Sequence, residues 1–162
     1  MMKNPPASEY AECLSKHHYT ECGLDNVFLA SGYTVESIGG REVVTIHNVD
    51  ALHDAIADDI IRNRPLMNGH EARFLRVEMD LSQQMLGQAL GVDAQTVARW
   101  EKGQTRMSGP VDRIIRLLYL GNRDGDPQIK HLIGRLAGLD ELDDHPRIFE
   151  KSPNGWRLRQ AA

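Results

Sequence analysis

One stretch, from Met79 to Arg106, constrains the fold of this chain more than any other part of the sequence. Ser82 is suited to an N-cap, and the apolar residues after it recur at the spacing of one helical face. That face ends at Gly91, and glycine is the residue that most readily takes a positive φ at a helix C-terminus. Asp93 can then cap a second short helix over residues 94–102. The sequence therefore predicts two short helices joined by a tight turn.

The second of these helices is predicted to have two different faces. Val97 and Trp100 lie on one side of it, which predicts a face buried in a core. The opposite side carries short or hydrogen-bonding side chains, namely Gln95, Ala98, Arg99 and Lys102. Such a helix can rest on a hydrophobic core while its other face contacts a polar surface.

Three groups of residues in this stretch stand at fixed spacing: Ser82-Gln83 at the start, Leu90-Gly91-Val92 at the turn and Trp100-Glu101-Lys102-Gly103 at the end. Together they resemble the helix-turn-helix of the Xre/Cro repressor family. Gly87 departs from the family pattern, because alanine is commoner there and glycine inside a helix costs about 1 kcal/mol relative to alanine. The resemblance implies a DNA-binding domain whose second helix enters the major groove.

On this resemblance, the second helix supplies the base contacts. Arg99 is the first candidate, since its planar guanidinium can donate two hydrogen bonds to guanine O6 and N7. Gln95, one turn earlier on the same face, suits adenine or a phosphate. Ala94 and Ala98 allow a close approach, and an alanine methyl can touch thymine. The alternative for Arg99 is a solvated arginine paired with an acidic residue.

Phosphate contacts are expected at both ends of the motif. The resemblance to phage repressors suggests one for Gln83, at the start of the supporting helix. Four further candidates lie at the end of the second helix or in the segment after it: Lys102, Gln104, Thr105 and Arg106. The alternative for these four residues is an ordinary solvated loop.

The amino-acid composition is compatible with a DNA-binding protein but does not by itself indicate one. The 162 residues are 41% hydrophobic and 26% charged, which is typical of globular proteins, and the net charge is −4. A local basic face suffices for DNA, and Arg99, Lys102, Arg106 and Arg113 can form one. The sequence shows neither a membrane-spanning run nor a signal peptide. We therefore expect a cytoplasmic bacterial protein, associated with the nucleoid through DNA and without a membrane partner.

The first part of the chain predicts a tail and a small α+β module. Residues 1–18 lack periodicity and read as a flexible tail. Residues 19–64 contain three β-rich runs followed by a helix from about residue 51 to 63, which Asp50 is predicted to cap. The β-rich runs predict an antiparallel meander and cover residues 26–30, 33–38 and 42–47.

The rest of the chain predicts a helical bundle and a C-terminal extension. Residues 67–121 form four helices, the first opening with the capping box of Asn68 and Glu71. Residues 122–162 add an amphipathic helix, Pro127 to Ala137, and a hairpin at 147–158 around an Asn-Gly turn. These elements serve dimerisation or docking, on the N-terminal sheet or on a second subunit. The fold class is α+β, with a lambda-repressor-like helix-turn-helix bundle.

Four residues near the N-terminus could form a zinc site, and the alternative is a metal-free fold. Cys13, His17, His18 and Cys22 have a Cys-x3-His spacing, but they lie across the predicted tail, so a metal-free fold is favoured and no cofactor is expected. Cys22 also lies near His47 and Asp50 in the sequence, without a nucleophile elbow, phosphate-binding loop or metalloprotease motif. We therefore expect no catalytic residue and no enzyme.

The favoured function is a sequence-specific transcriptional regulator, a repressor that binds a palindromic double-stranded DNA operator as a homodimer. A second reading starts from residues 18–25, the β-rich region and the repressor-like domain, which together are similar to antitoxins of the MqsA/YgiT type. That resemblance implies a toxin protein as partner of the N-terminal module, with DNA binding for autoregulation. The chain lacks the paired Cys-x-x-Cys motifs of those antitoxins.

Overall fold

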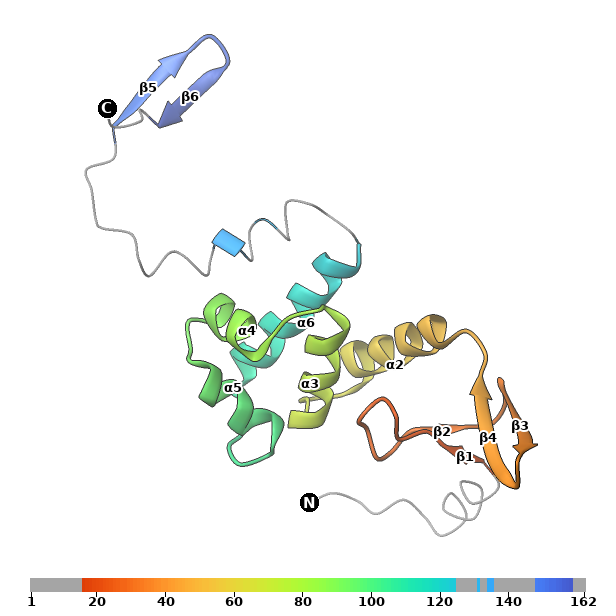
Figure 1. The fold of residues 1–162 in the computed structure, drawn as a ribbon. Coiled ribbons are helices and arrows are strands. Elements are labelled where there is room, and N and C mark those ends of the chain that lie inside the picture. The colour runs from red at the N-terminus through yellow and green to blue at the C-terminus, as the bar shows by residue number, and fades with distance from the viewer. Residues whose placement is uncertain (1–15, 125–130, 132–133, 136–147, 159–162) are drawn as a thin grey trace.

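The computed structural model describes residues 16–124, 131, 134–135 and 148–158, and it confirms the α+β class (Figure 1). The described helices are α2 (Val49–Asn63), α3 (Gly69–Glu78), α4 (Gln83–Leu90), α5 (Ala94–Glu101) and α6 (Gly109–Arg123). The described strands are β1 (His17–His18), β2 (Phe28–Leu29), β3 (Tyr33–Ile38), β4 (Arg41–Ile46), β5 (Phe149–Ser152) and β6 (Gly155–Leu158). No helix in these ranges combines the length and apolarity needed to cross a membrane.

The described strands form three separate antiparallel pairs, which differs from the predicted N-terminal meander. β3 pairs with β4 along its whole length, because Gly39 and Gly40 both take positive φ and make a two-residue turn. β2 pairs instead with β1, where His17 lies opposite Leu29 and His18 opposite Phe28. The strand at residues 17–18 was assigned to the predicted tail, so this long-range pairing was not foreseen.

Helix α2 begins earlier than predicted. Asn48 caps it, with its side-chain oxygen accepting a hydrogen bond from the Ala51 amide at 3.3 Å, so the prediction of Asp50 as the cap is wrong. Asp50 lies in the first turn instead, where a negative charge interacts favourably with the helix dipole. Ala57 and Ile60 are buried on the opposite side of the helix from the solvent.

A single hydrophobic core joins α2 to the helices that follow. Leu24, Ala57 and Ile60 belong to the same buried cluster as residues of α3, α4, α5 and α6. The members from those helices are Ala72, Phe74, Leu75, Leu86, Val97, Trp100, Ile115 and Tyr119. The core therefore crosses the boundary that the sequence predicted between residues 64 and 67.

The C-terminus of α2 is tied to α6 by Arg116. Its guanidinium donates to the carbonyls of Ile60 and Ile61 at 2.7 and 2.6 Å, and it pairs with Asp112 at 2.9 Å. Asp112, itself buried, also accepts a hydrogen bond from the Met67 amide at 2.8 Å. These bonds satisfy carbonyls that a helix end leaves without partners.

A second chain of hydrogen bonds attaches the segment after β1 to the helices. The Tyr19 hydroxyl is 2.9 Å from His53 Nε2, and His53 Nδ1 is 2.9 Å from the Glu78 carboxylate. Burial raises the pKa of the Tyr19 hydroxyl above its ordinary value. Residues of the N-terminal segment, α2 and α3 are thus connected by polar as well as apolar contacts.

The C-terminal hairpin is present, but its turn lies one residue earlier than the predicted Asn154-Gly155 turn. Ser152 pairs with Gly155, so Pro153 and Asn154 form a two-residue turn, and Gly155 follows with a φ of 117°. Arg157 lies 2.7 Å from Glu150 on the neighbouring strand. The predicted tail, residues 1–18, and the predicted helix from Pro127 to Ala137 fall mostly outside the described residues.

Candidate nucleic-acid interface

The two helices of the predicted motif are α4 and α5, and each begins with the predicted cap. The Ser82 hydroxyl accepts from the Met85 amide at 3.0 Å, and the Asp93 carboxylate accepts from the Thr96 amide at 2.6 Å. This hydrogen bond holds the pKa of the Asp93 carboxyl below its ordinary value. Gly91 ends α4 with a φ of 69°. The sequence therefore predicted the local conformation of the motif correctly.

Gly87 departs from the family pattern for a reason that the structure supplies. A Cβ at this position would lie 2.7 Å from the backbone oxygen of Val92, in the turn between α4 and α5. That distance is well inside van der Waals contact, so the turn packs directly on the glycine. The absent side chain offsets the helix-propensity cost of about 1 kcal/mol by allowing this close approach.

Helix α5 has the two faces that the sequence predicted. Val97 is 1% exposed and Trp100 is 9% exposed, which confirms both as core residues. Gln95 and Arg99 are exposed on the other side, and Ala94 and Ala98 are half-buried. α5 runs along an edge of the helical bundle (Figure 1). Among the described residues no carboxylate lies within 4.0 Å of the Arg99 guanidinium, although its charge adds to the lowering of the Asp93 pKa.

Gln83, at the first position of α4, is held by a residue that the sequence analysis did not single out. Its Nε2 donates to the Glu101 carboxylate at 2.8 Å. Glu101 is buried and forms a two-pronged ion pair with Arg76, at 2.6 and 3.1 Å. Arg76 also donates to the carbonyl of Leu81 at 2.6 Å, immediately before α4. The network therefore fixes the start of α4 relative to the end of α5.

The signal for this network was present in the sequence, in the Glu101 that follows Trp100. A glutamate one residue after a core tryptophan at the end of a helix must be either half-exposed or paired, because a buried carboxylate without a partner is costly. Its partner, Arg76, is 25 residues earlier in the chain, and spacing alone does not identify such a pair.

The segment after α5 presents the remaining predicted contacts. Gly103 takes a φ of 68°, and the amides of Gly103 and Gln104 each donate at 2.9 Å to carbonyls of α5. The turn is therefore ordered by the backbone. The four predicted phosphate contacts of this segment are all exposed: Lys102, Gln104, Thr105 and Arg106.

Helix α3 begins in direct contact with the end of α5. A Cβ built on Gly69 would overlap the backbone carbonyl oxygen of Trp100, and it would lie 3.0 Å from the Cα of Glu101. The capping box predicted for this helix is present, since Asn68 and Glu71 exchange hydrogen bonds at 2.9 Å.

Three of the four candidate zinc ligands lie in the described part of the chain. The ring of His17 lies against Tyr33, and its buried Nε2 has no hydrogen-bond partner among the described residues. His18 Nε2 is 2.8 Å from the carbonyl of Asp25, and Cys22 Sγ donates to the carbonyl of Tyr19 at 3.7 Å. Burial raises the pKa of the Cys22 thiol. Among the residues that the structure describes, no three His, Cys, Asp or Glu side chains are grouped as metal ligands, and Cys13 lies outside them.

Comparison with known proteins identifies one family. Residues 73–111 match the family described as Helix-turn-helix, a domain of the Xre/Cro type that binds DNA and is not an enzyme family. The match runs from α3 to the start of α6 and does not reach the N-terminal strands, so it does not show a similarity to the MqsA/YgiT antitoxins. Neither a curated protein nor a solved structure matches the chain. Residues 73–111 are therefore similar to an Xre/Cro-type helix-turn-helix, a domain found in DNA-binding transcription regulators.

Proposed function

We propose that this protein is a sequence-specific transcriptional repressor that binds a palindromic operator as a homodimer. The observation that carries the proposal is the exposed face of α5, where Gln95 and Arg99 stand one turn apart without an ion-pair partner among the described residues. The back of the same helix is fixed in the core by Val97 and Trp100. A rigid helix with a free hydrogen-bonding face is suited to direct readout in the major groove.

Each residue of this face has a role in the proposal. Arg99 donates to guanine O6 and N7, and Gln95 bonds adenine or a neighbouring phosphate. Ala94 and Ala98 are half-buried and short, so they let the helix enter the groove deeply and offer methyl groups to thymine. The specificity of the protein therefore depends mainly on two side chains.

Phosphate contacts flank these base contacts. A glutamine amide has two N–H donors, and Gln83 uses one of them on Glu101, which leaves the other for a phosphate oxygen. The exposed segment after α5 adds Lys102, Gln104, Thr105 and Arg106 on the other side of the reading helix. Because such contacts release counterions from DNA, affinity falls as salt concentration rises.

The homodimer is supported by an apolar face of α6 that points away from the core. Ile114 is 43% exposed and Leu117 is 68% exposed on this helix. A second copy of the chain can cover these side chains about a two-fold axis. The two reading helices then enter successive major grooves, about 34 Å apart, which matches a palindromic site.

The first test replaces Arg99 with alanine. We expect Arg99→Ala to lose about 1–3 kcal/mol of binding free energy on the operator and little on random DNA, because only the base contact is removed. The measurement is fluorescence anisotropy at two salt concentrations, using the DNA upstream of the gene and a scrambled duplex. The stoichiometry from the same titration gives the number of chains per operator.

The matched control is Arg62→Ala. Arg62 is an exposed arginine on α2, so this substitution removes the same charge at a position distant in sequence from α5. Both duplexes should bind this variant like the wild type. If Arg99→Ala weakens binding to both duplexes equally, Arg99 is a phosphate contact and its proposed base-reading role is wrong.

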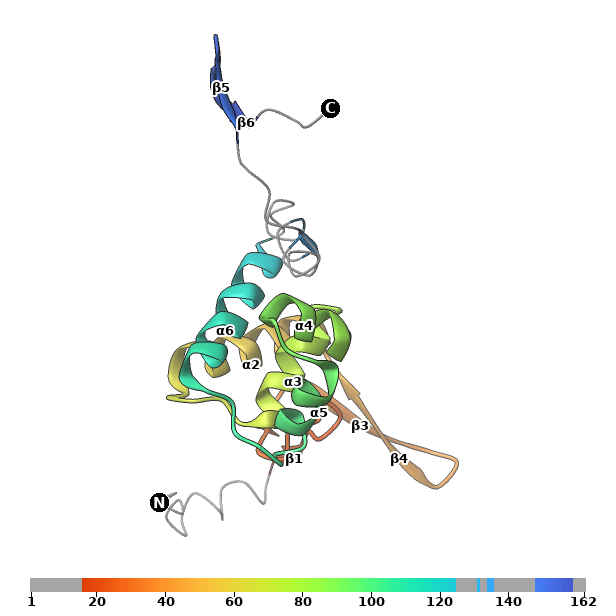
Figure 2. The same ribbon diagram turned by 90° about the vertical axis from the view of Figure 1, so that its left-hand side faces the viewer.

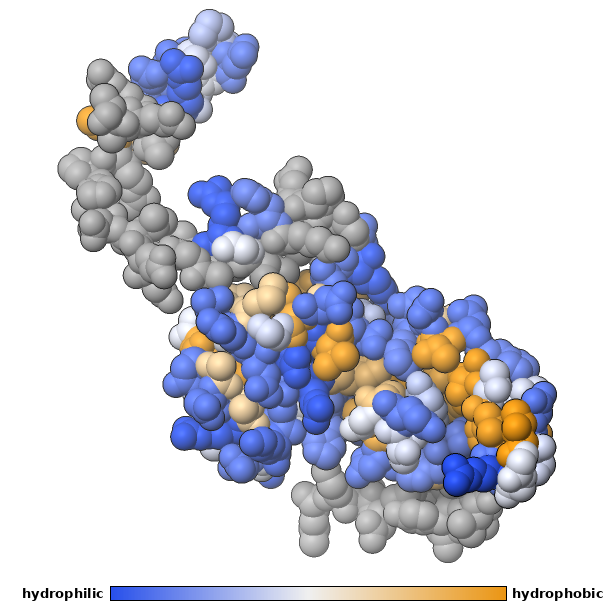
Figure 3. All heavy atoms as spheres, in the orientation of Figure 1, coloured by the Kyte–Doolittle hydropathy of each residue, from blue (hydrophilic) through white to orange (hydrophobic). Residues whose placement is uncertain are grey.

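A second candidate function is an antitoxin that binds a toxin protein, and one feature of the structure favours it. The β3–β4 ribbon extends away from the helices, and apolar side chains are exposed on it (Figures 2 and 3). Val35, Ile38 and Val43 are each more than 40% exposed. Exposed apolar side chains on a two-stranded ribbon are typical of a surface that binds another protein.

The test of this second function is co-expression with any small reading frame beside the gene. We expect the wild type to relieve growth inhibition by that protein, and Val43→Lys to relieve it less, by at least about tenfold in viable count, because a charge replaces an exposed apolar contact. Glu42→Lys, at the neighbouring exposed position, is the control. Equal rescue by both variants, or an adjacent frame without toxicity, contradicts the antitoxin function.

A further inference from the structure

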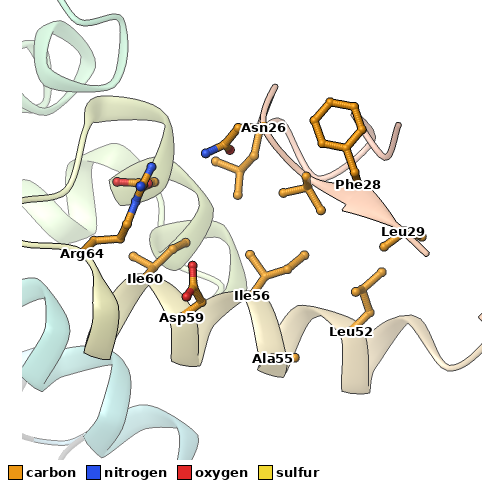
Figure 4. Close-up of a pocket in the computed structure, with 12 residues that line it drawn as sticks. Asn26, Phe28, Leu29, Leu52, Ala55, Ile56, Asp59, Ile60 and Arg64 are labelled. Carbon is orange, nitrogen blue, oxygen red and sulfur yellow. The ribbon is translucent and has the colours of Figure 1, made fainter. Parts of the chain in front are cut away.

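We infer that a cavity between α2 and the segment containing β2 is a binding site for a small amphipathic amine. The cavity has a volume of about 320 Å³, which lies within the range of small-molecule sites. Leu52, Ile56 and Ile60 rise from α2 toward it, and Leu29 faces them from the strand side, while the ring of Phe28 points away from α2 (Figure 4). None of the residues proposed to contact DNA lines this cavity, so the inference is independent of the proposed function.

The walls of the cavity are apolar but incompletely buried. Leu52, Ile56 and Val27 are half-buried, and Phe28 is 39% exposed. Filling the space would remove these surfaces from water, and burial of apolar surface is favourable by about 25 cal/mol per Å². The ligand therefore has an apolar body.

One end of the cavity is polar, and its charges do not balance. Arg64 donates through Nε to the buried carboxylate of Glu71 at 2.8 Å, and Glu71 accepts a further bond from the Asn68 amide. This ion pair neutralises the two residues and holds the pKa of Arg64 above its ordinary value. Asp59, which also lines the cavity, is exposed and accepts a hydrogen bond from the neutral side chain of Asn63 at 2.8 Å, and its charge adds to the raised pKa of Arg64.

The remaining negative charge of Asp59 selects the head group of the ligand. An ammonium can pair with this carboxylate, whereas a carboxylate ligand would meet repulsion from it and would have to compete with Glu71 for Arg64. Asn26 lines the same end and supplies an amide oxygen that can accept a second hydrogen bond from the ammonium. The polar end thus favours a cation over an anion.

A neighbouring cavity extends the space available to the apolar body. It has a volume of about 250 Å³ and shares Leu29 and Leu52 with the first. Ala51 and Ile46 continue its apolar lining toward the start of α2. A ligand with an unbranched chain can therefore place its head near Asp59 and direct its tail past Leu52.

The experiment compares three six-carbon probes, n-hexylamine, 1-hexanol and hexanoate, which share an apolar tail and differ in head group. Each is titrated into the ¹⁵N-labelled full chain, and the amide shifts of residues 24–29 and 52–64 are followed. We expect hexylamine to bind about fivefold more tightly than hexanol, since an exposed ion pair contributes up to about 1 kcal/mol. Hexanoate is expected to bind most weakly.

Three variants make the assignment specific. Asp59→Asn keeps the shape and should reduce hexylamine to the affinity of hexanol, while Asp54→Asn, an exposed aspartate on α2 that does not line the cavity, should change nothing. Ala55→Phe fills the cavity from an exposed position and should weaken all three probes. Hexanoate binding as tightly as hexylamine overturns the inference, as does the absence of shifts in the lining amides.

Discussion

Replacing Gly69 with alanine should destabilise the protein more than any other single methyl addition in the described part of the chain. The new Cβ would overlap the backbone carbonyl of Trp100, and backbone atoms cannot rotate away as a side chain can. We expect a loss of at least about 3 kcal/mol, at the upper end of overpacking effects. Because small domains are stable by only about 5–15 kcal/mol, this loss is enough to populate unfolded chains at growth temperature.

The measurement is urea denaturation of the full chain, followed by circular dichroism at 222 nm. Gly109→Ala is the matched control: Gly109 is also the first residue of a helix, but nothing lies within 4 Å of a Cβ built there. That control should stay within about 0.5 kcal/mol of the wild type or gain slightly. A stable Gly69→Ala protein would mean that α3 and α5 are farther apart than the structure places them.

The second large effect is expected from Glu101→Ala. This substitution removes the partner of Arg76, whose side chain is only 12% exposed, and leaves its guanidinium unpaired. Breaking a buried ion pair from one side costs about 3–5 kcal/mol. The same variant takes away the acceptor of Gln83, so the contact of α4 with phosphate should also weaken. Chemical denaturation gives the first effect and operator binding gives the second.

A double substitution separates the two contributions to this loss. Arg76→Met combined with Glu101→Leu removes both charges and should recover most of the stability, because apolar residues of similar volume replace a buried pair well. It should not restore the contact of Gln83, whose acceptor is still absent. Destabilisation of the double variant as large as that of Glu101→Ala would contradict the unpaired-charge explanation.

The elements that could be predicted from the sequence are those fixed by neighbours in the chain. The caps at Asn68, Ser82 and Asp93 and the positive φ of Gly91 depend on residues within one helical turn, and all four were predicted. The burial of Trp100 followed from helical periodicity. The C-terminal hairpin was predicted from Asn154-Gly155, although its turn is formed by Pro153 and Asn154.

The features that were missed depend on residues far apart in sequence. β2 pairs with β1 across nine intervening residues, and the sequence of a two-residue strand does not indicate its partner. Ala57 of α2 is completely buried in the core shared with the bundle, and a single alanine within a helix does not indicate such a contact. The Arg76–Glu101 pair was missed for the same reason. The base and phosphate contacts proposed for α4 and α5 stay predictions until DNA binding is measured.

The shared core of α2 and the helix-turn-helix bundle also bears on how this protein can change during evolution. A recombination event between residues 64 and 67 would combine a new N-terminal segment with a bundle shaped to receive Ala57 and Ile60. Such a hybrid would carry a mismatched interface, so the DNA-binding part cannot be exchanged as an independent cassette. Substitutions of the N-terminal segment that reach this interface are therefore expected to require compensating changes in α3 and α6.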